Sequence, residues 1–297
     1  MAQVTANGIQ IEYETFGERT NPAMLLINGL GSQLLSWDEG FCKLLVDRGF
    51  FVIRFDNRDV GLSTKFSDHP IANVPATLKA LREGQKVDVP YTLSDMAADA
   101  AGLLDALGIA AAHIVGVSMG GMIAQTFAIE HPQKTLSLTS IMSATGNPNI
   151  QLSTPEANAA LMTPAPADRE GYIEHTVANS KIIGSKGHLY DEERVRRRAA
   201  AAYDRQFYPE GVGRQLVAIN ASGSRKEKLA NVKVPTLVIH GDIDPLVRLE
   251  AGIDTAESIP GAELLVLEGM GHDLPEPLWE TIADAIAKNA AKATAAK

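Results

Sequence analysis

Short apolar runs alternate along this chain with longer segments of helical periodicity. Residues 9–16 place apolar side chains at alternate positions, which predicts an antiparallel edge strand. Later runs are apolar almost throughout and rich in β-branched residues, as is typical of strands buried in a parallel sheet. These predicted strands are residues 24–27, 50–55, 113–117, 136–142, 236–240 and 264–267.

Helical segments separate most of these strands. One helix is predicted over residues 37–48, one over residues 122–129, and a third ends at Gly108 after a cap at Thr92 or Ser94. The alternation of strands with helices predicts an α/β fold built on a mostly parallel sheet.

The alternation stops between residues 147 and 230. This stretch holds several prolines and helical segments but no strand pattern. We therefore expect a helical cap inserted into a core formed by residues 1–146 and 231–297. Apolar cap residues are candidates for a substrate pocket, although packing against the core is the commoner role of such side chains. The candidates are Leu161, Met162 and Ile182.

Residues 191–205 predict a charged helix within this insertion. Glu192 and Glu193 precede Arg196 and Arg197 by four residues, which is the spacing of ion pairs on one helix face. The arginines of the segment would suit an anion site, but the acidic residues in the same helix favour a solvated face.

The segment Gly116-Val117-Ser118-Met119-Gly120 carries the clearest chemical signal. A G-x-S-x-G pattern between a strand and a helix predicts a nucleophile elbow, a tight turn that exposes a serine hydroxyl. A free serine hydroxyl is a weak nucleophile, so the pattern requires a base later in the chain. Ser118 is the candidate nucleophile. The backbone N–H of Met119, at the helix start, is a candidate donor to a developing oxyanion.

The base and acid are expected after Ser118, in the order acid and then histidine. His272 follows the predicted strand 264–267 in a glycine-rich loop and is the candidate base. Asp242 and Asp244 both follow the strand 236–240, and the residues alone leave the acid open between them. Both loops come at carboxyl ends of strands, where open parallel sheets bind ligands.

A second oxyanion donor is expected in the loop Asn28-Gly29-Leu30-Gly31, which follows the strand 24–27. The backbone N–H of Leu30 is the candidate, paired with that of Met119. The same loop is a poor match to a nucleotide-binding G-x-G-x-x-G motif, because position 34 is leucine.

Together with residues 56–63, these motifs resemble those of α/β-hydrolase-fold serine hydrolases over nearly the whole chain. Within that family the chain is similar to the carboxylesterase-like anthracycline (aclacinomycin) methylesterase group. The resemblance implies an eight-stranded, mostly parallel sheet flanked by helices, and it favours Asp244, the carboxylate before Pro245, as the acid. The chain departs from the family pattern at Asn28, where histidine is usual, and at Asp59, where glycine is usual.

Composition narrows the possible partners. The 297 residues carry a formal net charge of −9, which disfavours nucleic acid as a ligand. The single cysteine, Cys42, excludes an internal disulfide and a thiolate metal cage, and no motif implies a metal or cofactor. No signal-peptide pattern or 18-residue apolar run is visible, so we expect a cytoplasmic location and no membrane span. The oligomeric state stays open between monomer and homodimer.

The sequence predicts hydrolysis of a small-molecule carboxylic ester through an acyl-enzyme intermediate. The alternatives are another serine-dependent reaction on the same scaffold (a lactonase, a carbon–carbon bond hydrolase or a perhydrolase) and, less favoured, a non-catalytic binding protein of this fold. The identity of the ester depends on cap geometry, which the sequence does not reveal.

Overall fold

The computed structural model describes residues 1–295 of the chain. Within these residues one sheet has the strand order β1-β2-β4-β3-β5-β6-β7-β8. The pairs β1–β2 and β2–β4 are antiparallel, and β3 to β8 run parallel. The predicted α/β fold with an eight-stranded, mostly parallel sheet is confirmed. The strands are β1 (Ala2–Ala6), β2 (Ile9–Phe16), β3 (Ala23–Ile27), β4 (Phe51–Phe55), β5 (Ala112–Val117), β6 (Thr135–Ile141), β7 (Thr236–Gly241) and β8 (Glu263–Leu267).

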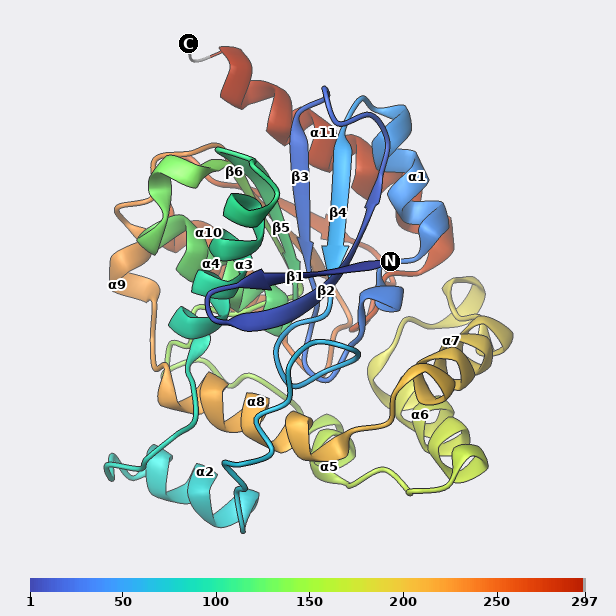
Figure 1. Ribbon diagram of the computed structural model, residues 1–297. Helices are drawn as coiled ribbons and strands as arrows, with labels where there is room; N and C mark the ends of the chain where they lie inside the picture. The colour runs from blue at the N-terminus through green and yellow to red at the C-terminus, as the bar shows by residue number, and fades with distance from the viewer. Residues whose placement is uncertain (296–297) are drawn as a thin grey trace.

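Helices cover both faces of the sheet (Figure 1). On one face α1 (Glu39–Asp47) and α11 (Trp279–Ala295) pack against the strands, and on the other face lie α3 (Leu93–Ala106), α4 (Met119–Glu130) and α10 (Leu249–Ser258). The central strands β3 and β4 are therefore buried along their whole length, which explains their continuous apolar runs.

The strand pairing corrects two of the sequence expectations. The predicted edge strand β2 lies inside the sheet, because β1 forms a hairpin with it. The hairpin turn places Asn7 and Gly8 at φ 50° and 78°, the backbone that tight hairpins need. The last strand was expected to be buried, but Leu264 and Val266 of β8 are 37% and 41% exposed, because β8 is the opposite edge of the sheet.

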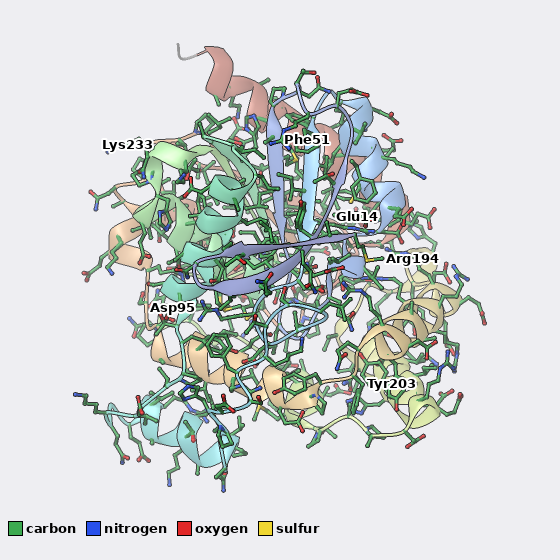
Figure 2. All side chains as sticks on the ribbon, viewed as in Figure 1. Glu14, Phe51, Asp95, Arg194, Tyr203 and Lys233 are labelled. Carbon is green, nitrogen blue, oxygen red and sulfur yellow. The ribbon has the colours of Figure 1, made fainter. Side chains whose placement is uncertain are left out.

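Between β6 and β7 the chain forms helices and no strand. They are α5 (Pro155–Met162), α6 (Arg169–Ile183), α7 (Glu192–Arg205), α8 (Pro209–Ala221) and α9 (Lys226–Leu229). Helices α5 to α8, with α2 (Val74–Arg82), lie beyond the carboxyl ends of the parallel strands (Figure 1). Figure 2 shows Tyr203 out on the α6–α7 pair, away from Phe51 in the sheet. None of the helices in the described chain is long and apolar enough to cross a membrane.

A buried ion pair fixes α8 to the core. Asp59 lies in the loop after β4 with a φ of 68°, in the left-handed region that favours glycine. Its carboxylate accepts two hydrogen bonds from the Arg214 guanidinium of α8, at 2.7 and 3.0 Å, and one from the Tyr91 hydroxyl at 2.6 Å. Gly211 allows the helix to approach, since a Cβ there would lie 2.0 Å from the Asp59 carbonyl oxygen. The aspartate that departs from the family pattern thus anchors a helix of the insertion.

We expect Arg214→Ala to lower the free energy of unfolding by about 3–5 kcal/mol, because it leaves the carboxylate of Asp59 buried and unpaired. Urea unfolding followed by circular dichroism measures the change. Arg196→Ala is the matched control, since Arg196 pairs with Glu174 and Glu192 on the exposed surface of α7. An effect of Arg214→Ala no larger than that of this control would contradict the anchoring role.

Candidate active site

The chain turns sharply between β5 and α4, and Ser118 lies at the turn. Its φ of 54° and ψ of −121° belong to a sparsely populated region that costs a non-glycine residue about 1–3 kcal/mol. The turn is anchored on both sides. The Ser118 N–H donates to the Ile141 carbonyl at 2.9 Å, and the Ser118 carbonyl accepts from the Ser143 hydroxyl at 2.7 Å. Neighbouring residues of β6 and the loop after it therefore hold the strained backbone.

Two glycines allow this turn to form. A Cβ on Gly116 would lie 2.0 Å from the Gly120 carbonyl oxygen, and a Cβ on Gly120 would lie 2.2 Å from the Ile27 carbonyl oxygen. Both distances are far inside van der Waals contact, so no larger residue fits. The strand, tight turn and helix expected around Ser118 are all present.

The structure brings Ser118, His272 and Asp244 into one hydrogen-bonded line. The Ser118 hydroxyl donates to His272 Nε2 with an Oγ–Nε2 distance of 2.9 Å, and the His272 Nδ1–H donates to Asp244 Oδ2 at 2.7 Å. Ser118 and His272 are partly exposed, whereas Asp244 is only 4% exposed. A carboxylate on Nδ1 leaves Nε2 as the nitrogen that accepts a proton from the serine.

Asp242 and Asp244 have different partners. Asp244 Oδ1 accepts hydrogen bonds from the backbone N–H groups of Leu246 and Val247, both at 2.9 Å, which leaves Oδ2 for His272. Asp242 is exposed, and its carboxylate accepts from the Gly269 N–H at 2.7 Å. The structure therefore brings Asp244 and not Asp242 to the imidazole.

A second histidine lies beside Asp244. His240 is fully buried, and its Nε2 is 3.9 Å from Asp244 Oδ2. Because Nε2–H donates to the Val247 carbonyl at 2.6 Å, the ring carries its proton there. Burial lowers the pKa of His240 and keeps this ring neutral. His240 therefore supports the turn that holds Asp244 and does not compete with His272 for its charge.

The two expected oxyanion donors come from the residue after Ser118 and from the loop after β3. A Cβ built on Gly29 would be 3.3 Å from Ser118 Cβ, so the loop after β3 touches the serine. The N–H groups of Leu30 and Met119 have no hydrogen-bond partner within residues 1–295. Met119 is the first residue of α4, where the helix dipole favours negative charge. Asn28 braces the loop, since its amide donates to the Phe55 carbonyl at 2.8 Å.

The loop of residues 28–31 is also held by a residue that the sequence did not indicate. Gln215 of α8 is fully buried, and its Oε1 accepts from the Gly31 N–H at 2.8 Å while its Nε2 donates to the Arg58 carbonyl at 2.9 Å. Gln215 therefore fixes the peptide that follows Leu30. Its position comes from the packing of α8, and no local sequence signal marks it.

The loop that carries His272 is likewise held, by residues at the end of α6 and just after it. The His272 N–H donates to the Ile183 carbonyl at the end of α6 at 2.7 Å, and the Gly271 N–H donates to the Ser185 hydroxyl at 2.9 Å. A Cβ on Gly271 would lie 2.3 Å from the Gly184 carbonyl carbon. Close packing of these two loops thus sets the position of the imidazole.

A family model for the alpha/beta hydrolase fold matches residues 22–276 of this chain. The chain belongs to the alpha/beta hydrolase fold family.

Several curated proteins and solved structures of this family are similar to the chain. Rhodomycin D methylesterase from Streptomyces peucetius is 29% identical, and the match covers 98% of each protein. 3-Oxoadipate enol-lactonase 2 from Acinetobacter baylyi is 27% identical over 89% of this chain and 87% of its own. The meta-cleavage product hydrolase from Pseudomonas fluorescens IP01 has the same fold, with a TM-score of 0.76, 20% identity and coverage of 99% of this chain and 98% of that chain.

Two other titratable side chains, His113 and Cys42, are buried. Burial lowers the pKa of His113 to about 4, and its Nδ1 contacts the Ser137 hydroxyl at 2.9 Å. Burial also raises the pKa of Cys42 to about 12, which keeps the thiol protonated and unreactive. No cluster of His, Cys, Asp or Glu within the described residues has the arrangement of a metal site.

A cavity of about 760 Å³ lies between α6, α7 and the loop that follows Leu30. Leu161 and Met162 end α5, and Ile182 is in the last turn of α6; all three are partly buried, and none of them lines this cavity. Their role as pocket residues stays a prediction.

We expect Asp244→Ala to slow the reaction of Ser118 with a fluorophosphonate by about 10³- to 10⁴-fold, because the imidazole loses the group that orients it. Asp242→Ala is the matched control and should change the labelling rate by less than a few-fold. Labelling is followed by intact-protein mass spectrometry. Equal losses in the two variants would contradict the assignment of distinct partners.

Proposed function

We propose that this protein is a serine hydrolase that cleaves small-molecule carboxylic esters through an acyl-enzyme intermediate. Ser118 is the nucleophile, His272 the general base, and Asp244 the carboxylate that orients it. The backbone N–H groups of Leu30 and Met119 form the oxyanion hole. Residues 147–230 form a helical cap over a core of residues 1–146 and 231–297.

The observation that carries this proposal is the continuous line of hydrogen bonds from Ser118 to Asp244. The distances of 2.9 and 2.7 Å place a nucleophile, a base and an orienting acid in contact without rearrangement. Full-length similarity to a methylesterase supports ester hydrolysis as the reaction. A lactone is a cyclic ester. The similarity to an enol-lactonase therefore makes a cyclic ester a second candidate substrate.

In the acylation step, His272 Nε2 takes the Ser118 proton as Oγ attacks the ester carbonyl carbon. The carbonyl oxygen becomes an oxyanion and accepts hydrogen bonds from the N–H groups of Leu30 and Met119. Such fixed donors contribute about 3–4 kcal/mol each to lowering the barrier. The tetrahedral carbon then breaks its bond to the alcohol oxygen, which receives the proton from His272 and leaves as the alcohol.

Deacylation repeats these proton transfers with water. His272 removes a proton from a water molecule, whose oxygen attacks the acyl carbon, and the same two amides hold the second oxyanion. The bond between the carbonyl carbon and Ser118 Oγ breaks, and the proton on Nε2 returns to the serine. The products are the free acid and the regenerated enzyme.

Two measurements test the mechanism. One is labelling with a fluorophosphonate followed by peptide mass mapping, and the other is the rate of p-nitrophenyl acetate hydrolysis. We expect label on Ser118 and loss of hydrolysis in step with labelling, and we expect Ser118→Ala to lower kcat by at least about 10⁴-fold. Ser94→Ala is the control, because Ser94 is an exposed hydroxyl of α3 that donates to Glu130. Ester hydrolysis that survives full labelling would overturn the proposal.

We expect Gln215→Ala to lower kcat for p-nitrophenyl acetate by about 10- to 100-fold with little change in KM, because the loop that carries the Leu30 amide loses its support. Asn220→Ala is the matched control, since Asn220 lies exposed on the same helix and bonds only to the Leu216 carbonyl. An increase in KM at unchanged kcat would show that Gln215 acts on substrate binding instead of on the oxyanion loop.

A further inference from the structure

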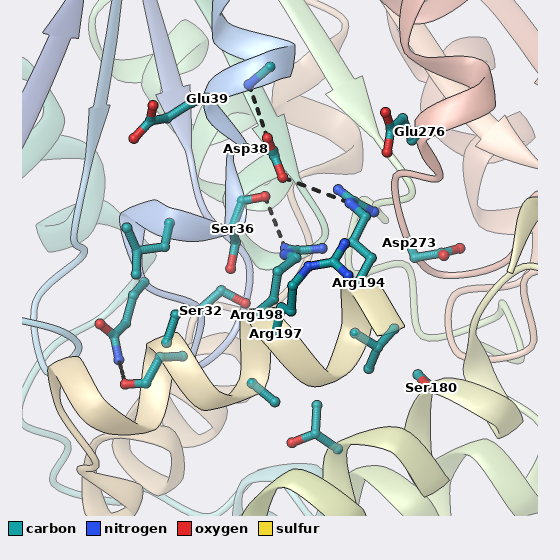
Figure 3. Close-up of a pocket in the computed structure, with 18 of the residues that line it drawn as sticks. Ser32, Ser36, Asp38, Glu39, Ser180, Arg194, Arg197, Arg198, Asp273 and Glu276 are labelled. Atoms are coloured by element: carbon teal, nitrogen blue, oxygen red, sulfur yellow. Dashed lines mark hydrogen bonds and ion pairs between the residues drawn. The ribbon is translucent and has the colours of Figure 1, made fainter. Parts of the chain in front are cut away.

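One arginine is buried in the protein without a carboxylate partner. Within residues 1–295, four arginines are at most 5% exposed, and three of these pair with an acidic side chain. The pairs are Arg54 with Glu14, Arg58 with Asp99 and Arg214 with Asp59. Even the less buried Arg194, which lines the cavity beside α7, has Asp38 at 3.8 Å (Figure 3). The fourth buried arginine, Arg225, forms no ion pair within the described residues.

Arg225 caps the start of α9, and neutral acceptors alone bind its side chain. Its Nε donates to Gln125 Oε1 at 3.2 Å, and its two terminal nitrogens donate to the carbonyls of Ala144 at 2.9 Å and Gly223 at 3.3 Å. Burial lowers the pKa of Arg225 to about 10, so the group stays charged at neutral pH. A buried cation without a counter-charge costs stability, and an apolar residue would avoid this cost. The position therefore requires the guanidinium group itself.

Two of the acceptors belong to segments that adjoin Ser118. Gln125 lies on α4, the helix that begins directly after the serine, and Ala144 lies in the loop after β6. The backbone N–H of Arg225 donates to the Thr145 carbonyl of the same loop at 2.8 Å. Arg225 therefore joins this loop to α4 through its side chain and its backbone.

The loop after β6 supports the strained backbone of the serine. Ser143 in this loop is 1% exposed, and its hydroxyl donates to the Ser118 carbonyl at 2.7 Å. Met142 before it has a φ of 42°, a left-handed value that a non-glycine residue keeps only where its surroundings impose it. A Cβ on Gly121, in the first turn of α4, would lie 2.5 Å from Ser143 Cβ, so the loop and the helix touch. Two strained residues thus lie at the segments that Arg225 joins.

The shape of the guanidinium group suits this connection. It carries five N–H donors in one plane, whereas the ammonium of a lysine is a compact point charge. Gln125 extends the network, since its Nε2 donates to the Ser140 hydroxyl of β6 at 3.1 Å. Arg225, Gln125 and Ser140 are all buried, so the network excludes water. A forked donor can therefore hold α4 and the loop after β6 in one fixed arrangement.

We propose that Arg225 is a positioning residue for the nucleophile, because it holds the loop after β6 against α4 and so keeps the Ser118 hydroxyl in reach of His272. The distance from Ser118 Oγ to His272 Nε2 is 2.9 Å, and a shift of the turn by about 1 Å would break this hydrogen bond. The inference rests on the proposed function, since it gives Arg225 a part in the reactivity of Ser118.

Two variants of Arg225 test the proposal. We expect Arg225→Lys and Arg225→Gln each to lower kcat/KM for p-nitrophenyl acetate and the rate of fluorophosphonate labelling by about 10- to 100-fold. Both rates should fall by a similar factor, because the two reagents differ in shape and share only the serine. Rates are expressed per active site, counted by the end point of labelling, so that unfolded protein does not imitate a slower enzyme. Gln125→Met removes only the connection to α4 and should lie between the wild type and Arg225→Lys.

Two controls separate positioning from stability. Leu104→Ala opens a cavity in the core at the last turn of α3, at the amino ends of the parallel strands. It should lower the midpoint of urea unfolding and leave both rates per active site unchanged. Lys228→Gln, exposed on α9, should behave as the wild type in stability and in rate.

Hydrogen–deuterium exchange of residues 142–145 tests the connection without any reaction. We expect faster exchange in Arg225→Lys than in the wild type and no change in Lys228→Gln. Equal exchange, or unchanged rates per active site in both Arg225 variants, would overturn the proposal. Wild-type rates in Arg225→Lys would also overturn it, because charge alone would then suffice. Labelling of Ser118 that slows in the Arg225 variants, in a protein that hydrolyses no ester, would count against the proposed function alone.

Discussion

The left-handed backbone at Ser118 is the constraint on which the arrangement of the site depends. The residue keeps a φ of 54° because the strand before it, the helix after it and the loop after β3 all approach within contact of the turn. These approaches require glycine at positions 116 and 120, and they bring Gly29 against the serine. The same packing that strains the serine therefore places the loop after β3 beside it, so the proposed nucleophile and the proposed oxyanion donors are positioned by one steric condition.

Residues between β6 and β7 contact the loops beside Ser118 and His272. Gln215 holds the peptide after Leu30, and the Ile183 carbonyl holds the His272 backbone. The Asp59–Arg214 ion pair anchors α8, which carries Gln215 as the next residue after the arginine. Contacts from the residues between β6 and β7 thus reach two loops that the proposed mechanism uses. Movement of this region would therefore change the geometry of the proposed site.

The sequence predicted best those features that a local pattern encodes. The central strands and the contact between Ser118 and His272 could be predicted because apolar runs and glycine-flanked turns are adjacent in the chain. The expectation of an edge strand over residues 9–16 was wrong, although Asn7-Gly8 is itself a local hairpin signal. The exposure of β8 could not be predicted, because an edge strand and an interior strand of a parallel sheet share the same apolar run. Gln215 and the Ile183 carbonyl escaped prediction because their roles depend on how distant helices pack.

Helix α7 shows why a pattern of charges in the sequence does not reveal which side chains of a helix form ion pairs. Successive arginines point in different directions, because each residue of an α-helix is rotated by about 100° from the one before it. That rotation sends Arg196 to Glu174 and Glu192, while Arg197 and Arg198 line the cavity. Neighbouring residues of the same type thus have different surroundings: Arg196 pairs with two carboxylates, Arg197 is exposed to solvent, and Arg198 donates to the Ser36 carbonyl. The surroundings of each arginine therefore depend on the rotation of α7 relative to the core, which no motif around Ser118 contains.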